Sequence, residues 1–142
     1  MALTVQVVID SNDPHPLAAW WAQTLGWNVE PQDPDFIRRM VAEGHASEDD
    51  TMEYEGSLGW RVGAAINHPD PDSGTPRILF QWVPEPKTAK NRAHLDLRAD
   101  GEDLEALRAR LIERGATVLH EGRQGPQTWL TMADPQGNEF CV

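Results

Sequence analysis

The feature that most constrains the fold of this chain is an internal repeat. Each half reads as a strand, a helix that ends at a glycine, and then three short strands. The strand "TVQVVID" (4–10) precedes a helical stretch that ends at Gly26, and the strand "HLDLRAD" (94–100) precedes one that ends at Gly115. The pattern predicts two similar units, residues 1–83 and 92–142, joined by a proline- and lysine-containing linker over 84–91.

The two expected helices carry apolar stripes with helical spacing, and short strand patterns follow each of them. Asp13 and Pro14 are typical of a helix start. The stripes are Leu17, Trp20, Trp21 and Leu25 in the first helix, and Leu104, Leu107, Leu111 and Ile112 in the second. The later strands are expected at 25–29, 60–66 and 77–83, and at 114–118, 128–134 and 138–142. One stretch, 33–59, does not repeat and is expected to form a short helix and an acidic loop.

The expected fold class is α+β, a single domain over 1–142 made of two βαβββ modules. A four-stranded sheet with one helix on one side leaves its other face uncovered, and two such sheets can curl around a shared cleft with the helices outside. The cleft could form within one chain or between two exchanged chains.

Strand alternation predicts which side chains enter that cleft. Leu95 and Leu97 should face the helix, whereas His94, Asp96 and Arg98 should face the cleft. The same alternation directs Gln6 on the first strand, and Gln81 and Glu139 on the last strand of each half, to the cleft. Trp82 lies opposite Gln81 and is expected in the core, and Cys141 is expected to behave as a small buried apolar group.

Net charge argues against two classes of main partner. The formal charge of −11 would repel a nucleic-acid backbone or an anionic membrane surface. No apolar run near the N-terminus is long enough for a membrane span, and the single cysteine excludes an internal disulfide. These features predict a cytoplasmic protein that binds a neutral or cationic small molecule.

Several phrases of the chain resemble the vicinal oxygen chelate superfamily, which includes glyoxalase I, extradiol dioxygenases and bleomycin-resistance proteins. They are "VVIDSNDPHPLAAWWAQTLGW", "KNRAHLDL" and "MADPQGNEFCV", and they look most like a glyoxalase-like branch. Members pair βαβββ modules, commonly as homodimers, and take metal ligands from the first and last strands of each module. The resemblance therefore implies a divalent-metal site of Gln6, Gln81, His94 and Glu139, with Glu139 as ligand or catalytic proton shuttle.

The expected ligand set departs from the glyoxalase pattern at Gln81, where that pattern carries a carboxylate. Without a thiolate in the set, Zn, Ni, Mn, Mg or Fe(II) would all suit it. An extradiol dioxygenase would need a second histidine. The alternative is that Gln6 and Gln81 are ordinary amides and that "DPQGNEF" is a signature of the fold alone.

Two functions follow from these expectations. The first is a metal-dependent lyase or isomerase acting on a small substrate with vicinal oxygens. The second is a non-enzymatic binder of a cationic aromatic compound, of the bleomycin-resistance kind. In either case Trp60, Trp129, Asp96 and Arg98 are candidates to contact the ligand. The acidic run 43–55 is either a rim for a cationic ligand or a solvated loop, and an interaction module is a third possibility.

Overall fold

The computed structural model describes residues 1–142, and the chain divides into two compact units. Unit 1 comprises Met1–Pro84 and unit 2 comprises Glu85–Val142. Nearly all of the segment expected to be a linker therefore lies within unit 2.

Unit 1 contains a four-stranded mixed sheet with an inserted segment. Its elements are β1 (Val7–Ser11), α1 (Pro14–Leu25), β2 (Asn28–Val29), α2 (Pro34–Ala42), the 3-10 turn η1 (Glu48–Asp50), β3 (Thr51–Tyr54), β4 (Ser57–Trp60), β5 (Gly63–Asn67) and β6 (Ile78–Trp82). The main sheet has the order β1-β6-β5-β2, in which β1 and β6 are parallel and the other pairs antiparallel. Strands β3 and β4 form a separate hairpin.

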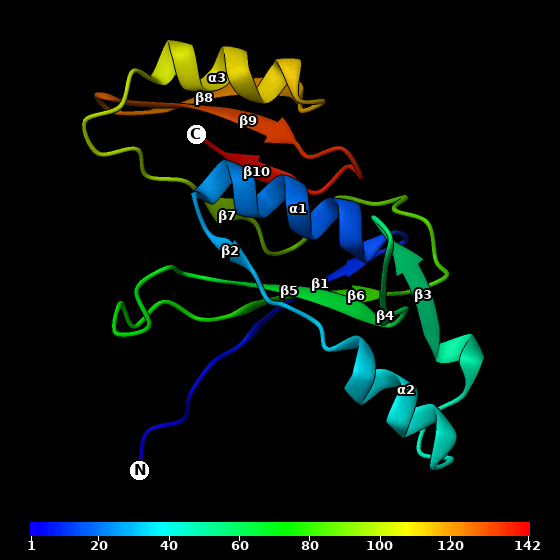
Figure 1. The fold of residues 1–142 in the computed structure, drawn as a ribbon. Helices are drawn as coiled ribbons and strands as arrows, with labels where there is room; N and C mark the ends of the chain where they lie inside the picture. The colour runs from blue at the N-terminus through cyan, green and yellow to red at the C-terminus, as the bar shows by residue number, and fades with distance from the viewer. The chain divides into compact units, whose positions relative to one another are not determined.

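Helix α1 packs on β5 and β6 through the stripe that its sequence predicts (Figure 1). Leu17 and Trp21 are each 1% exposed, and Trp20 is also buried. The helix ends at Gly26, whose φ of 67° is left-handed and whose N–H donates to the carbonyl of Ala22. A glycine adopts this conformation at least cost, so the sequence fixes where α1 stops.

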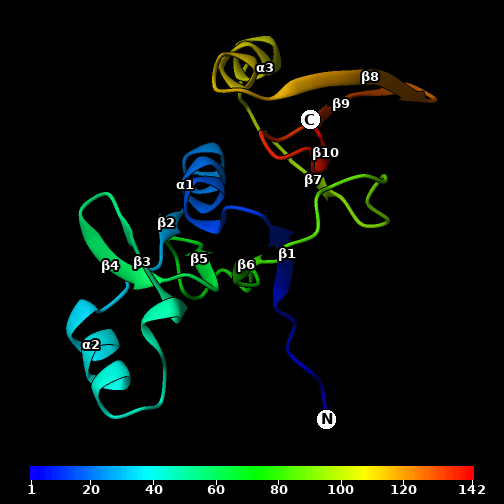
Figure 2. The ribbon, with the colours of Figure 1, turned by 90° about the vertical axis from the view of Figure 1, so that its right-hand side faces the viewer.

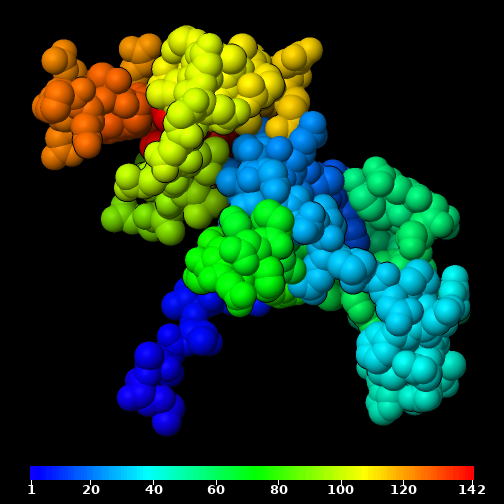
Figure 3. Space-filling view, turned by 60° about the vertical axis from the view of Figure 1, so that its left-hand side comes forward, coloured from blue at the N-terminus to red at the C-terminus, as the bar shows by residue number.

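The inserted segment between β2 and β5 differs from its expected structure in one respect. Helix α2 forms, with the Asp33 carboxylate accepting from the N–H groups of Asp35 and Phe36. The rest of the segment is not only an acidic loop, because Thr51–Trp60 folds into the β3–β4 hairpin. As a result Trp60 ends β4 and is not on the strand with Gly63. Figure 3 shows α2 and the hairpin as a lobe at one side of unit 1.

Unit 2 repeats the main-sheet topology of unit 1 without an insertion. Its elements are β7 (Leu95–Asp96), α3 (Leu104–Glu113), β8 (Thr117–Gln124), β9 (Gln127–Ala133) and β10 (Glu139–Cys141). The sheet order is β7-β10-β9-β8, with β7 and β10 parallel. Because this order matches β1-β6-β5-β2 element by element, the predicted α+β fold of two βαβββ modules is confirmed.

Helix α3 has a narrower buried face than its sequence predicts. Leu107 and Leu111 are buried, but Leu104 is 41% and Ile112 49% exposed. The Asp103 carboxylate accepts from the N–H groups of Glu105 and Ala106 and fixes the helix start. Figure 2 shows α3 on one side of its sheet. None of the three α-helices has the length and apolar character needed to cross a bilayer.

Candidate functional site

The face of the unit 2 sheet opposite the buried Phe140 and Met132, here called the open face, carries the polar side chains of Asp96, Thr131 and Cys141. Cys141 of β10 is opposite both Asp96 of β7 and Thr131 of β9. Residues opposite each other in register point to the same side of a sheet. The alternate residues Phe140 and Met132 are fully buried, so they mark the opposite, core side. The alternation predicted for β7 is therefore correct: Leu95 is half-buried while Asp96 is exposed.

Three potential metal ligands converge on the open face. The donor atoms of His94, Asp96 and Cys141 all lie within 4.8 Å of one another. His94 Nε2 is 3.4 Å from Asp96 Oδ1, and both side chains are exposed. The hydroxyl of buried Thr131 is 3.5 Å from Cys141 Sγ, within hydrogen-bonding reach. Strand spacing explains the group, since His94 immediately precedes β7, two residues before Asp96, and Cys141 is the partner of Asp96 on β10.

The donor chemistry of this group fits a transition metal. Imidazole, carboxylate and thiolate are the ligands that Zn²⁺ takes in proteins, and three protein ligands leave a coordination position open for water or substrate. The sulfur of Cys141 is a donor that the expected ligand set did not include. It moves the preference from oxygen-seeking Mg²⁺ toward Zn²⁺ and its borderline-soft neighbours.

Cys141 is the residue of this group that sequence reasoning missed. Its alternation with Glu139 already indicated the open face, but a lone cysteine was given the usual fate of a buried apolar group. The structure makes it half-buried, beside a histidine and an aspartate. The missing signal was the register between β7 and β10, which alternation within one strand cannot supply.

Glu139 lies on the same face but is held by the segment that precedes β7. Its Oε1 is 3.1 Å from Lys87 Nζ, and its Oε2 accepts from the backbone N–H of Asn91 at 3.1 Å. Burial alone would raise the pKa of Glu139. Hydrogen bonds from backbone N–H groups and the neighbouring Lys87 ammonium outweigh burial and lower that pKa. The carboxylate is thus ionised and already paired with a cation.

The turn before β10 accounts for the phrase "DPQGNEF" as local structure. The Asp134 side chain is buried and accepts from the backbone N–H groups of Gln136 and Asn138 at 2.9 and 3.0 Å. The Asn138 side-chain amide donates to the same carboxylate, and its oxygen accepts from Asn91. These residues close the turn and tie it to the segment before β7.

The two glutamine ligands expected from the first half are not neighbours in unit 1. Gln6 precedes β1 and accepts from Arg77 Nη1 at 2.9 Å. Gln81 is exposed and pairs in register with Asp10, four residues along the strand from Gln6. Four strand residues correspond to about 13 Å. The structure therefore brings His94 together with Asp96 and Cys141, but it does not bring Gln6 together with Gln81.

The expected ligand-binding residues have different environments. Trp129 lies on the open face opposite Gly122, where an added β-carbon would overlap its indole ring. Arg98 is exposed just beyond β7. Trp60 ends the inserted hairpin of unit 1, and its carbonyl accepts from His15. Trp82 was expected in the core, but it is 43% exposed because it ends β6, beyond the buried Phe80.

The two βαβββ units define a protein of the vicinal oxygen chelate class. The chain belongs to the glyoxalase-like domain family, whose model matches residues 6–142. A comparison with curated proteins found no match.

Solved structures support the same fold over nearly the full chain. The structure of hypothetical protein SA1046 from S. aureus matches with a TM-score of 0.60 and 12% identity, covering 99% of this chain and 92% of that one. A putative glyoxalase family protein from Bacillus anthracis matches at 0.52 and 14%, covering 99% and 93%. The bleomycin-binding protein of Streptomyces verticillus, complexed with copper(II)-bleomycin, matches at 0.52 and 15%, covering 99% and 94%. At these identities the similarity shows the fold alone.

Proposed function

We propose that unit 2 binds a divalent metal through His94, Asp96 and Cys141, and that the protein is a glyoxalase-like lyase or isomerase for a small substrate with vicinal oxygens. The observation that supports this most strongly is the convergence of three donor atoms within 4.8 Å on the open face. A metal bound there would act as a Lewis acid toward a substrate oxygen. The preferred ion on this donor set is Zn²⁺, with Ni²⁺, Mn²⁺ and Fe²⁺ as the ions to compare.

The proposal gives a role to each polar residue around the three metal ligands. The Asp96 carboxylate, close to His94 Nε2, orients the imidazole as well as offering an oxygen donor. The Thr131 hydroxyl positions the Cys141 sulfur. Arg98, which alternation along the chain predicts on the same side as Asp96, supplies a cation for an anionic substrate oxygen. Glu139 as proton shuttle stays a prediction, because an ionised carboxylate with a lowered pKa is a weak base.

The test is metal content and affinity of untagged protein. Near-stoichiometric zinc in the wild type, lost in His94→Ala and Cys141→Ser, is the expected result. His45→Ala is the matched control, because it removes an exposed histidine of unit 1. Less than about a tenth of an equivalent of metal after incubation with each ion would overturn the proposal. Loaded protein would then be assayed with α-ketoaldehyde, epoxide and catechol substrates.

Gln6, Gln81 and Glu139 as further ligands stay predictions and are tested in the same way. Gln6 is already hydrogen-bonded to Arg77, and Glu139 to Lys87. If they add ligands, Gln6→Ala, Gln81→Ala or Glu139→Gln should each weaken zinc binding roughly tenfold or more. Unchanged affinity in all three would restrict the metal site to the unit 2 group.

A second candidate function, metal-free binding of a cationic aromatic compound, is favoured by Trp129 and by charge. The indole of Trp129 covers Gly122 on the open face, where it could stack on a planar cation. The net charge of −11 would attract such a ligand. Binding that survives chelator, weakens with salt and is lost in Trp129→Ala would favour this function.

We further propose a homodimer as the assembly. Val5, Val8 and Trp82 are large apolar side chains exposed in unit 1, and exposed apolar surface is often covered by a second subunit. Light scattering coupled to size exclusion should give twice the monomer mass. A monomer mass at micromolar concentration would contradict this expectation.

A further inference from the structure

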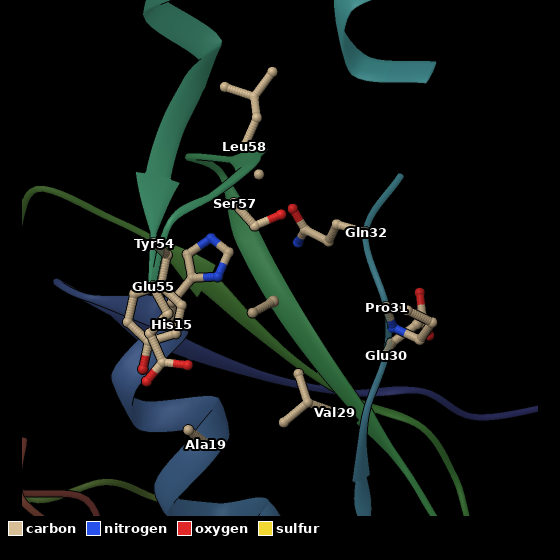
Figure 4. A pocket seen from close by; sticks show the side chains of 12 residues that line it. His15, Ala19, Val29, Glu30, Pro31, Gln32, Tyr54, Glu55, Ser57 and Leu58 are labelled. Carbon is tan, nitrogen blue, oxygen red and sulfur yellow. The ribbon is translucent and has the colours of Figure 1, made fainter. Parts of the chain in front are cut away.

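Unit 1 contains a pocket of about 330 Å³ on the side of its main sheet that α1 covers (Figure 4). It lies between the start of α1, the chain that follows β2, and the β3–β4 hairpin. Gln81 and Asp10 are on the opposite face of the same sheet, as the register with the buried Phe80 indicates. The volume is at the small end of the range for ligand sites in proteins. The inserted segment that breaks the repeat therefore supplies part of the wall of this pocket.

Side-chain hydrogen bonds to the backbone hold the pocket open. Buried His15 donates from Nε2 to the carbonyl of Trp60 at 2.8 Å. Gln32 accepts from the N–H of Trp60 at 2.6 Å and donates to the carbonyl of Gly63 at 3.0 Å. These bonds join α1, the chain after β2 and the hairpin to β5. The pocket is therefore formed before any ligand arrives.

Gly59 of the hairpin lies against the hydrogen-bonded side chains of His15 and Gln32, where a larger residue would not fit without a shift. A β-carbon on Gly59 would lie 2.6 Å from Gln32 Oε1 and 3.2 Å from His15 Cε1. The hairpin backbone can approach the two polar side chains only because no side chain intervenes.

The walls are mainly apolar, and two glutamates are among the polar residues of the lining. Ala19, Val29 and Leu58 line the cavity, together with Tyr54, whose ring stacks on His15 at 5.2 Å. No lysine or arginine is among the lining residues. Burial raises the pKa of Tyr54, and the carboxylates of Glu55 and Asp13 raise it further. The phenol is thus neutral in a region of negative potential.

Glu55 is a carboxylate of the pocket lining that forms no salt bridge with a lysine or arginine. The other lining glutamate, Glu30, is held by a two-point ion pair with Arg77. Glu55 interacts instead with the neutral Tyr54. An ionised carboxylate has acceptor sites beyond the one such contact uses.

The backbone of Glu55 points to a role beyond the turn. Glu55 and Gly56 form the two-residue loop of the hairpin, with φ of 48° and 78°, and Glu55 is the one non-glycine residue of the chain with positive φ. Such turns favour Asn, Asp or Gly at the first position. A glutamate is disfavoured there, and residues kept in disfavoured conformations cluster at ligand sites.

We propose that this pocket binds a small organic amine, with its ammonium group on the Glu55 carboxylate and its apolar body against Tyr54, Val29 and Leu58. The apolar walls, a carboxylate without a salt bridge to a lysine or arginine, and a lining without lysine or arginine select this ligand class over an anion or a sugar. The site belongs to unit 1 alone and does not rest on the proposed metal site of unit 2.

The experiment is a titration of ¹⁵N-labelled full-length protein with phenethylamine in the presence of EDTA. We expect saturable shifts of the Gly56 and Gly59 amides and of the Gln32 side-chain amide. Glu55→Asn should weaken the affinity roughly tenfold or more, by loss of a charged hydrogen bond. Its thermal midpoint should be equal or higher, because Asn suits the turn better. Glu55→Gln removes the charge alone and should weaken binding similarly.

Two controls make the result specific to the pocket. Glu53→Gln changes an exposed acid on the same hairpin and should leave the affinity unchanged. 2-Phenylethanol, a neutral molecule of the same shape, should bind at least roughly tenfold more weakly than the amine. The proposal is overturned if the Glu55 variants bind normally, if the alcohol binds equally well, if Trp129→Ala is the variant that loses binding, or if millimolar amine produces no saturable shift.

Discussion

Lys87 Nζ lies 3.1 Å from Glu139 Oε1, and this ion pair fastens the segment before β7 to the last strand of unit 2. The Lys87 ammonium also donates to the carbonyl of Ala89, and Asn91 donates to Asn138 in the neighbouring turn. Residues 85–91, which their composition suggested to be a linker, are therefore an ordered part of unit 2.

The ion pair makes stability depend on pH in a defined direction. Because the folded pKa of Glu139 is lowered, its contribution is complete above the unfolded pKa of about 4.3 and is lost as pH falls through the folded value. Wild type should exceed Glu139→Gln in unfolding free energy by about 1 kcal/mol near neutral pH. Urea unfolding at several pH values measures the difference, which should vanish in strong acid. Glu121→Gln, on exposed β8, serves as control and should show no such trend.

Asp134 should be among the most sensitive positions of unit 2. Asp134→Ala leaves buried N–H donors without an acceptor and should cost about 3 kcal/mol of unfolding free energy. Asp134→Asn keeps one acceptor oxygen and should cost less than half as much. Chemical denaturation compares the two. Equal losses would mean that the charge, rather than the hydrogen bonding, holds the turn.

Gly122 should not tolerate a side chain while Trp129 is present. Gly122→Ala forces the indole from its place and should cost about 1 to 3 kcal/mol. Trp129→Leu should remove most of that cost, so the two changes should be non-additive in a double-mutant cycle. Near-ultraviolet circular dichroism should also change in Gly122→Ala. Additive costs would place the strain elsewhere in β8.

The stability of the Arg77–Glu30 pair should depend on the planar guanidinium of arginine and not on positive charge alone. Arg77 Nε and Nη2 contact the two oxygens of Glu30 at 2.8 Å each, and this pairing lowers the pKa of Glu30. Arg77→Lys loses the two-point geometry. Both side chains are more than a third exposed, so the cost should be at most about 1 kcal/mol and should shrink with salt. A larger cost that ignores salt would contradict this.

The repeat was predictable because the start, the end and the apolar face of each helix follow from the local sequence. The glycine stop at Gly26 and the apolar faces around Leu17 and Leu107 each follow from one segment of chain. Alternation also identified which side of β7 carries His94 and Asp96.

What could not be predicted depends on register between distant strands. To predict that Asp96 and Cys141 are neighbours, one must know the register between β7 and β10. To predict that Gln6 and Gln81 are apart, one must know the register between β1 and β6. The exposure of Trp82 follows from its position at a strand end, which alternation does not reveal. The inserted hairpin was missed because its acidic residues obscured a strand pattern broken by Glu55 and Gly56.

The carboxylate of Asp134 accepts hydrogen bonds within its own turn, and this bears on how relatives should be grouped. Proteins that share the phrase around Asp134 share a way of starting β10, and this says nothing about their substrates. The side chains beside it on the open face, such as Cys141, are the ones that carry the donor atoms of the proposed metal site. A useful classification would sort related chains by those side chains.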